Sequence, residues 1–161
     1  MSDQANKTPL EEENLELDKG FKIFLKQWFS GFLEGIKELD DEDLLKIFAL
    51  TGRACVKIHS GGSFWEIWEA TRNIDDFILK INEFHGEELY KRVDSKIFVK
   101  YSRCRCPLVK FDIVNSSVIC NCFNWLGENF ETILKEPVKV FTEKTILRGD
   151  KNCKFIIFFG S

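Results

Sequence analysis

The hydrophobic periodicity of this 161-residue chain changes once, at Gly86. Before that glycine, apolar residues recur at spacings of three and four, which is the period of an amphipathic helix. After it, short apolar runs separated by turn residues are typical of β-strands. Because helices fill the first half and strands dominate the second, the sequence predicts an α+β fold whose mostly antiparallel sheet carries one inserted helix.

Four helices are expected before Gly86, over residues 21–36, 41–60, 63–73 and 74–84. The first of them carries one wide apolar stripe, which favours a surface that faces the core: Phe21, Phe24, Leu25, Trp28, Phe29, Phe32, Leu33 and Ile36. The fourth is expected to end at His85-Gly86, where glycine fits a left-handed cap.

The second half is expected to contain a β-hairpin around Asp94-Ser95-Lys96 and further short strands. The strand predictions cover residues 108–114, 118–122, and two C-terminal segments joined around Gly149-Asp150. Between them, residues 123–134 are expected to form the inserted helix, which Pro137 terminates.

Composition limits the kinds of protein this chain can be. Residues 14–161 are expected to form one domain after a flexible acidic lead-in over residues 1–13. The 16 Phe and 4 Trp suit a thick core or an apolar ligand cavity. A net charge of −3 without a basic stripe argues against nucleic acid as a partner.

The chain has no apolar run near the ~20 residues that a transmembrane helix needs, and its polar N-terminus is not a signal peptide. We therefore expect a cytoplasmic protein with reduced thiols. Six cysteines in a reducing compartment indicate metal binding or thiol chemistry more than a disulfide scaffold.

Two Cys-x-Cys pairs, Cys104/Cys106 and Cys120/Cys122, flank a short apolar run. Residues i and i+2 of a strand face the same side of a sheet, so each pair is expected to present two sulfurs together. If the two segments lie side by side, four thiols converge, as a tetrahedral zinc site requires, and iron is a second candidate metal.

Three further residues are candidates for the same metal site. Cys55 and His59 lie four residues apart on one helix face, and Cys153 follows the C-terminal turn. Two other interpretations of the cysteines stay open: a catalytic or redox thiol whose pKa Arg103 or Arg105 would lower, or small buried side chains. Strand alternation would place both arginines opposite the cysteines.

Two other titratable residues have two interpretations each. His85, at a helix end, is interpreted as a capping or solvent-facing residue more readily than as a functional one. Glu143 lies in an otherwise apolar strand, so it is a site acid if it faces inward, or a surface residue if the strand is at an edge.

The C-terminal third, CNCFNWLGENFETILKEPVKVFTEKTILRGDKNCKFII, resembles the tail of vinyl-reductase-like small-molecule-binding domains. The matching motif is Gly149-Asp150-Lys151-Asn152-Cys153-Lys154-Phe155. Upstream, Gly52-Arg53-Ala54-Cys55 and Cys104-Arg105-Cys106-Pro107 are similar to motifs of a related cysteine-rich bacterial and archaeal group, although Thr51 stands where its members often have a second cysteine. A similar tail occurs in aminothiazoline-carboxylate hydrolase-like proteins.

The resemblance covers about residues 45–160. It implies the fold of haem-NO-binding domains and small TRAPP subunits, in which N-terminal helices pack on a twisted, mostly antiparallel sheet around an apolar pocket. It also implies a hydrophobic small molecule as ligand. We therefore expect a binding or sensor domain whose pocket borders the cysteines. The alternatives are a cysteine-dependent hydrolase of a small heterocycle and a protein-interaction subunit, with a homodimer as one possible assembly.

Overall fold

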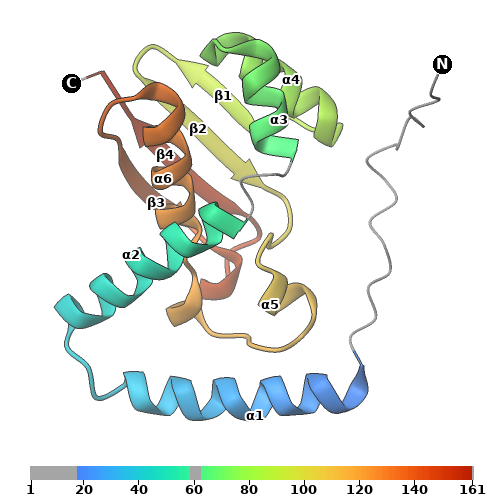
Figure 1. Cartoon of the computed structure of the whole chain (residues 1–161), viewed down its shortest axis with the longest axis vertical. Helices are drawn as coiled ribbons and strands as arrows, with labels where there is room; N and C mark the ends of the chain where they lie inside the picture. The colour runs from blue at the N-terminus through green and yellow to red at the C-terminus, as the bar shows by residue number, and fades with distance from the viewer. Residues whose placement is uncertain (1–17, 59–62, 161) are drawn as a thin grey trace.

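The computed structural model describes residues 18–58 and 63–160. Its helices are α1 (Lys19–Ile36), α2 (Asp41–Ile58), α3 (Ser63–Thr71), α4 (Ile74–His85), α5 (Pro107–Lys110) and α6 (Cys122–Leu134). Its strands are β1 (Tyr90–Val93), β2 (Lys96–Tyr101), β3 (Lys139–Lys144) and β4 (Cys153–Phe158). The predicted α+β class is confirmed. Along the chain, α1 to α4 precede the first strand, and α6 lies between β2 and β3 (Figure 1).

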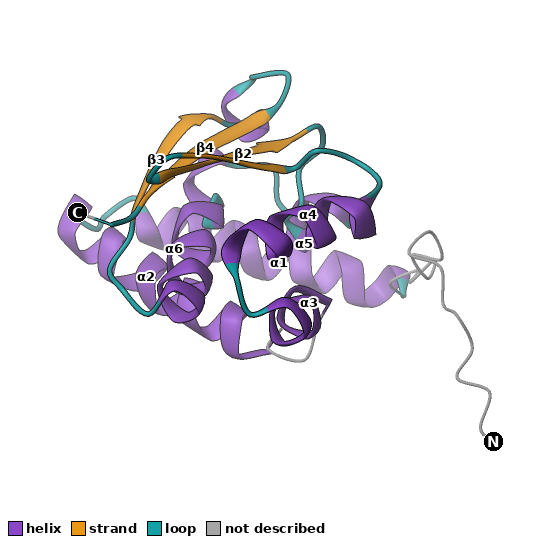
Figure 2. Cartoon of the chain, turned by 90° about the horizontal axis from the view of Figure 1, so that it is seen from above, coloured by secondary structure: helices purple, strands orange, loops and turns teal. Residues whose placement is uncertain are grey.

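The four strands form one antiparallel sheet in the order β1-β2-β4-β3. The helices gather on one side of this sheet (Figure 2). In β2 the side chains alternate between exposed and buried, so Ile97, Val99 and Tyr101 face the helices. A half-exposed sheet packed under helices is the two-layer arrangement that the sequence predicts.

Local sequence signals explain the junction between the helices and the sheet. The Asn73 side chain accepts a hydrogen bond from Asp76 N at 2.9 Å and caps the start of α4. Gly86, at φ 66°, ends the same helix in the left-handed conformation. The Asn82 amide then holds both backbone groups of Tyr90, donating to its O at 2.7 Å and accepting from its N at 3.0 Å. The end of α4 and the start of β1 are thereby fixed together.

The main core lies between α3, α4, α6 and the sheet. Phe64, Phe77 and Phe130 pack edge to face there, with ring centroids 4.8 to 6.3 Å apart. From the sheet, Phe155 and Ile157 complete this cluster, and both are fully buried. The phenylalanine excess therefore supplies much of a thick core.

The first helix departs from its prediction. Of the eight apolar residues in its stripe only Ile36 is buried, and Phe21, Phe24 and Trp28 are 50%, 56% and 55% exposed. Only Leu25, Phe29 and Leu33 of the helix pack on a small second cluster, which is built on Ile113 and neighbouring residues of the 113–119 segment. That segment is too short to cover a stripe so wide, so the expected core-facing surface is wrong for these three aromatics.

Two predicted strands, residues 108–114 and 118–122, are also wrong. Pro107 occupies the first turn of α5, a position that suits proline because the nitrogen there needs no hydrogen bond. The Ser116 side chain accepts from Val118 N and starts the short 3₁₀ helix Ser117–Ile119. Neither Cys-x-Cys pair therefore lies on a strand. Among the helices of residues 18–58 and 63–160, none is long and apolar enough to cross a membrane.

Candidate functional site

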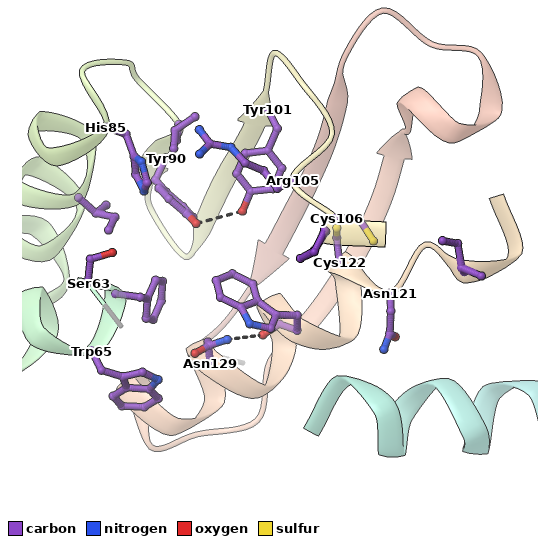
Figure 3. A pocket seen from close by; sticks show the side chains of 16 residues that line it. Ser63, Trp65, His85, Tyr90, Tyr101, Arg105, Cys106, Asn121, Cys122 and Asn129 are labelled. Carbon is purple, nitrogen blue, oxygen red and sulfur yellow. Dashed lines mark hydrogen bonds between the residues drawn. The ribbon is translucent and has the colours of Figure 1, made fainter. Parts of the chain in front are cut away.

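A cavity of about 390 Å³ lies between the helices and one end of the sheet. Its wall comes from α3, α4, α6, the β1 and β2 ends, and the loop that carries Arg105 and Cys106 (Figure 3). The apolar part of the wall is aromatic and aliphatic, and its members are Phe64, Trp65, Ile81, Leu89, Pro107, Ile119 and Trp125.

Tyr90 and Tyr101 form a polar part of the cavity wall at one end of the cavity. Their hydroxyl oxygens are 3.0 Å apart and share a hydrogen bond, and both side chains are buried (Figure 3). Burial raises the pKa of Tyr90 to about 12. The pKa of Tyr101 is raised well above its usual value by burial first and then by the Tyr90 hydroxyl beside it. Both phenols are therefore neutral at physiological pH.

Arg105 brings a positive charge to the same end of the cavity. Its Nη2 donates to Glu87 Oε1 at 2.7 Å, and its guanidinium carbon lies 5.7 Å from the centroid of the Tyr101 ring. Its Nε is buried and has no hydrogen-bond partner among the described residues. A buried guanidinium donor without an acceptor is unusual. Because a guanidinium can only donate, any ligand atom that Arg105 contacts in the cavity must be an acceptor.

The arginine reaches the cavity because the first Cys-x-Cys pair lies in a loop. A strand would have placed Arg105 opposite Cys104 and Cys106, as the alternation of strand side chains requires. In the structure, residues 104–106 are irregular, and both Arg105 and Cys106 line the cavity. The expected separation of arginine and cysteine is therefore wrong for Arg105.

The two Cys-x-Cys pairs come together beside Arg105 and the tyrosine pair. Cys106 and Cys122 line it, and Figure 3 shows their side chains close to one another. A hydrogen bond from the Cys122 thiol lowers the pKa of Cys120 to about 6 and raises that of Cys122. Burial opposes the lowered value, whereas the charge of Arg148 supports it. The pair therefore loses its first proton easily and its second with difficulty.

Cys104 and Cys153 complete a group of five neighbouring thiols. Burial raises the pKa of both, and each is raised further by the nearby Cys120. Cys153 also accepts a hydrogen bond from Ile146 N at 3.4 Å. All five described cysteines are free.

Proximity alone does not make a metal site. Within the described ranges, no three His, Cys, Asp or Glu side chains are placed so that they could hold a metal ion. Of the other two candidate ligands, Cys55 lies on α2 with its side chain outside the description, and His59 falls in the undescribed segment 59–62. Zinc or iron binding by these residues stays a prediction.

Of the two titratable residues with two interpretations, His85 lies at the cavity and Glu143 lies on the surface. His85 is the last residue of α4, half-buried, and lines the cavity, so its interpretation as a solvent-facing cap missed a wall residue. Glu143 is exposed on β3, which is an edge strand, so it is a surface residue and not a site acid.

Sequence reasoning missed the tyrosine pair, although a signal was present. In the hairpin register Tyr90 lies opposite Val99, two residues from Tyr101. Positions two apart on a strand share a face, so the predicted hairpin already places both hydroxyls on one side of the sheet. Arg105 had no such signal, because its contact with Glu87 joins two loops.

No family model matches the chain, and a search of the curated proteins finds no match. The resemblance to vinyl-reductase-like domains thus rests on the motifs alone and stays a prediction. The structure does give the C-terminal motif a local role. Gly149 adopts φ 92°, and Asp150 Oδ2 accepts from Thr145 N at 3.0 Å. The resulting turn brings Cys153 to Ile146 N.

Proposed function

We propose that this protein is a small-molecule-binding domain whose cavity takes a hydrophobic ligand. The observation that supports the proposal is the cavity of about 390 Å³, walled mainly by apolar and aromatic side chains and bordered by a few convergent polar groups. Ligand pockets in proteins have this size range and this mixture of walls. Burial of ~200 Å² of apolar ligand surface would contribute about 5 kcal/mol.

We favour binding over thiol catalysis by the same residues. A cysteine-dependent hydrolase needs a base within hydrogen-bond reach of its thiol. In Figure 3, His85 stands across the cavity from Cys106 and Cys122, on the side of α4. The groups that lower the pKa of Cys120 are first the Cys122 thiol and then the charge of Arg148, and they include no imidazole or carboxylate.

The test is a titration of the purified protein with N-phenyl-1-naphthylamine, a neutral apolar dye that fluoresces when it leaves water. We expect saturable binding to the wild type. Ser63→Trp places a large side chain at the cavity wall and should weaken dye binding by at least about tenfold, which is about 1.4 kcal/mol. Glu66→Trp is the matched control, because it adds the same side chain to the exposed face of α3.

Two results would contradict the proposal. The first is the absence of saturable binding to a wild type that is folded by circular dichroism. The second is binding that Ser63→Trp leaves unchanged, since the dye would then lie elsewhere. Native mass spectra of the same samples report bound zinc or iron, a co-purified ligand and a homodimer, all of which stay predictions.

A further inference from the structure

We propose that the ligand is an amphipathic monocarboxylate, whose acid group binds at the end of the cavity formed by Arg105, Tyr90 and Tyr101. This inference rests on the proposed function and names the chemical class of its ligand. It starts from the polar groups of the cavity, because apolar walls accept any apolar body, and only the polar groups can select a head group.

The first of these groups is the Arg105 guanidinium. Its Nη2 is engaged by Glu87 at 2.7 Å, but its buried Nε has no acceptor among the described residues. A guanidinium can only donate hydrogen bonds, so a ligand atom that contacts Arg105 inside the cavity must be an acceptor. Carboxylate oxygens make the shortest and strongest hydrogen bonds of this kind.

The tyrosine pair supplies a second donor at the same end. The hydrogen bond between the two hydroxyls uses one of their two hydrogens, and either oxygen can be the donor. The other hydrogen is available to the cavity, which both side chains line. Because burial keeps the two phenols protonated at physiological pH, the pair presents a neutral O–H to an anion and not a phenolate.

Arg105 and the tyrosines also act on one another. The guanidinium carbon lies 5.7 Å from the centroid of the Tyr101 ring, and the positive charge of Arg105 lowers the pKa of both phenols against the opposing effect of burial. One cation and one hydroxyl donor suit a single carboxylate. A phosphate dianion would need more positive charge than Arg105 supplies, and an ammonium head would meet a guanidinium.

The ion pair between Glu87 and Arg105 allows the affinity for an acid to be raised or lowered by substitution. Its carboxylate competes with the ligand for Arg105, and its side chain is 36% exposed against 27% for the arginine. Glu87 is therefore the outer partner and the ligand would be the inner one. Removal of the Glu87 charge should strengthen acid binding, whereas removal of the Arg105 charge should weaken it.

The experiment displaces the bound naphthylamine dye with three ten-carbon molecules that differ only in the head group: decanoate, decanol and decylamine. At neutral pH we expect wild-type protein to bind decanoate at least about tenfold more tightly than decanol, and decylamine most weakly. Arg105→Met, which keeps the side-chain stem beside Tyr101, should remove the preference for decanoate and leave the affinity for decanol within about twofold. Glu87→Gln should raise the affinity for decanoate and leave that for decanol unchanged.

The outcomes separate this inference from the proposed function. If the dye does not bind the wild type, the proposed function fails and this inference fails with it. If the dye binds but decanol or decylamine displaces it as well as decanoate does, or decanoate does not displace it, only the acid-binding inference is overturned. The wild-type series needs no variant, so a variant that does not fold cannot hide that result.

Discussion

Tyr90 and Tyr101 are the only two tyrosines of the chain, and both belong to the cavity wall. Any tyrosinate signal from the folded protein therefore reports on this one pair. Both side chains are buried, and a phenolate there would lose its hydration. The pair is thus a spectroscopic probe of the proposed binding site.

We expect the folded protein to develop tyrosinate absorbance only well above pH 10, because burial raises the pKa of Tyr90 to about 12 and raises that of Tyr101 well above its usual value. Both pKa values are higher in the folded than in the unfolded state. The stabilisation is therefore complete below the unfolded pKa near 10 and is lost as the pH rises above it.

An absorbance titration with parallel circular dichroism checks this expectation. Protein unfolded in guanidinium chloride should titrate near pH 10, as ordinary tyrosine does. In the native sample, tyrosinate should appear only together with the loss of secondary structure. Half of the signal developing near pH 10 while the helices remain intact would show that the two hydroxyls are in contact with water.

The crossing of α2 and α6 depends on one glycine, Gly52. A Cβ built at this position would lie 2.6 Å from Asn124 Cβ of α6, closer than two carbon side chains can approach. The same glycine opens the Gly-Arg-Ala-Cys motif, so this part of the motif has a packing explanation.

In Gly52→Ala the methyl group should cost about 1–3 kcal/mol, because α2 or α6 must shift to admit it. Alanine ordinarily favours a helix over glycine by ~1 kcal/mol, so the free energy of unfolding should fall by up to about 2 kcal/mol. Gly31→Ala is the matched control, since α1 has nothing within 4 Å of that position. The control should be more stable by up to ~1 kcal/mol. Urea unfolding midpoints measure both, and a stabilising Gly52→Ala would refute the close crossing.

Elements with a strong local signal could be predicted from the sequence. The start of α4 at its Asn73 cap, its end at Gly86, and the hairpin around Asp94-Ser95 each depend on neighbouring residues. The segment over residues 102–121 could not be predicted in this way. It has no sustained period, and Pro107 and Ser116 start short helical turns within apolar runs that otherwise favour strands. The position of Arg105 in the candidate site could not be predicted either, because Arg105 belongs to that segment.

At the scale of the whole molecule, the described residues pack into two apolar clusters of unequal size. The large one joins α3, α4, α6 and the sheet, and the small one joins α1 to the loop that carries Ile113. Outside the small cluster, α1 is held to this loop by Lys22 and Lys26, whose Nζ atoms lie 3.3 and 2.7 Å from Asp112 Oδ2. Exposed ion pairs of this kind add little stability.

We therefore expect α1 to open by local unfolding while the main cluster stays folded. In native-state hydrogen exchange, the amides of α1 should exchange at least ~100-fold faster than those of α6 and β4, whose buried side chains belong to the large cluster. The comparison with α4 is the sharpest control. It is shorter than α1, with 12 residues against 18, yet it buries Phe77, Ile78 and Ile81 where α1 buries only Ile36.

Protection of α1 equal to that of α4 would contradict the local-opening expectation, and repetition at two protein concentrations identifies the reason. Protection that is independent of concentration means that contacts within one chain hold α1. Protection that grows with concentration means that self-association covers the exposed Phe21, Phe24 and Trp28, as the predicted homodimer would. Exposed aromatics on one helix would then be part of an interface, and the stability of α1 would depend on assembly and not on its own short cluster.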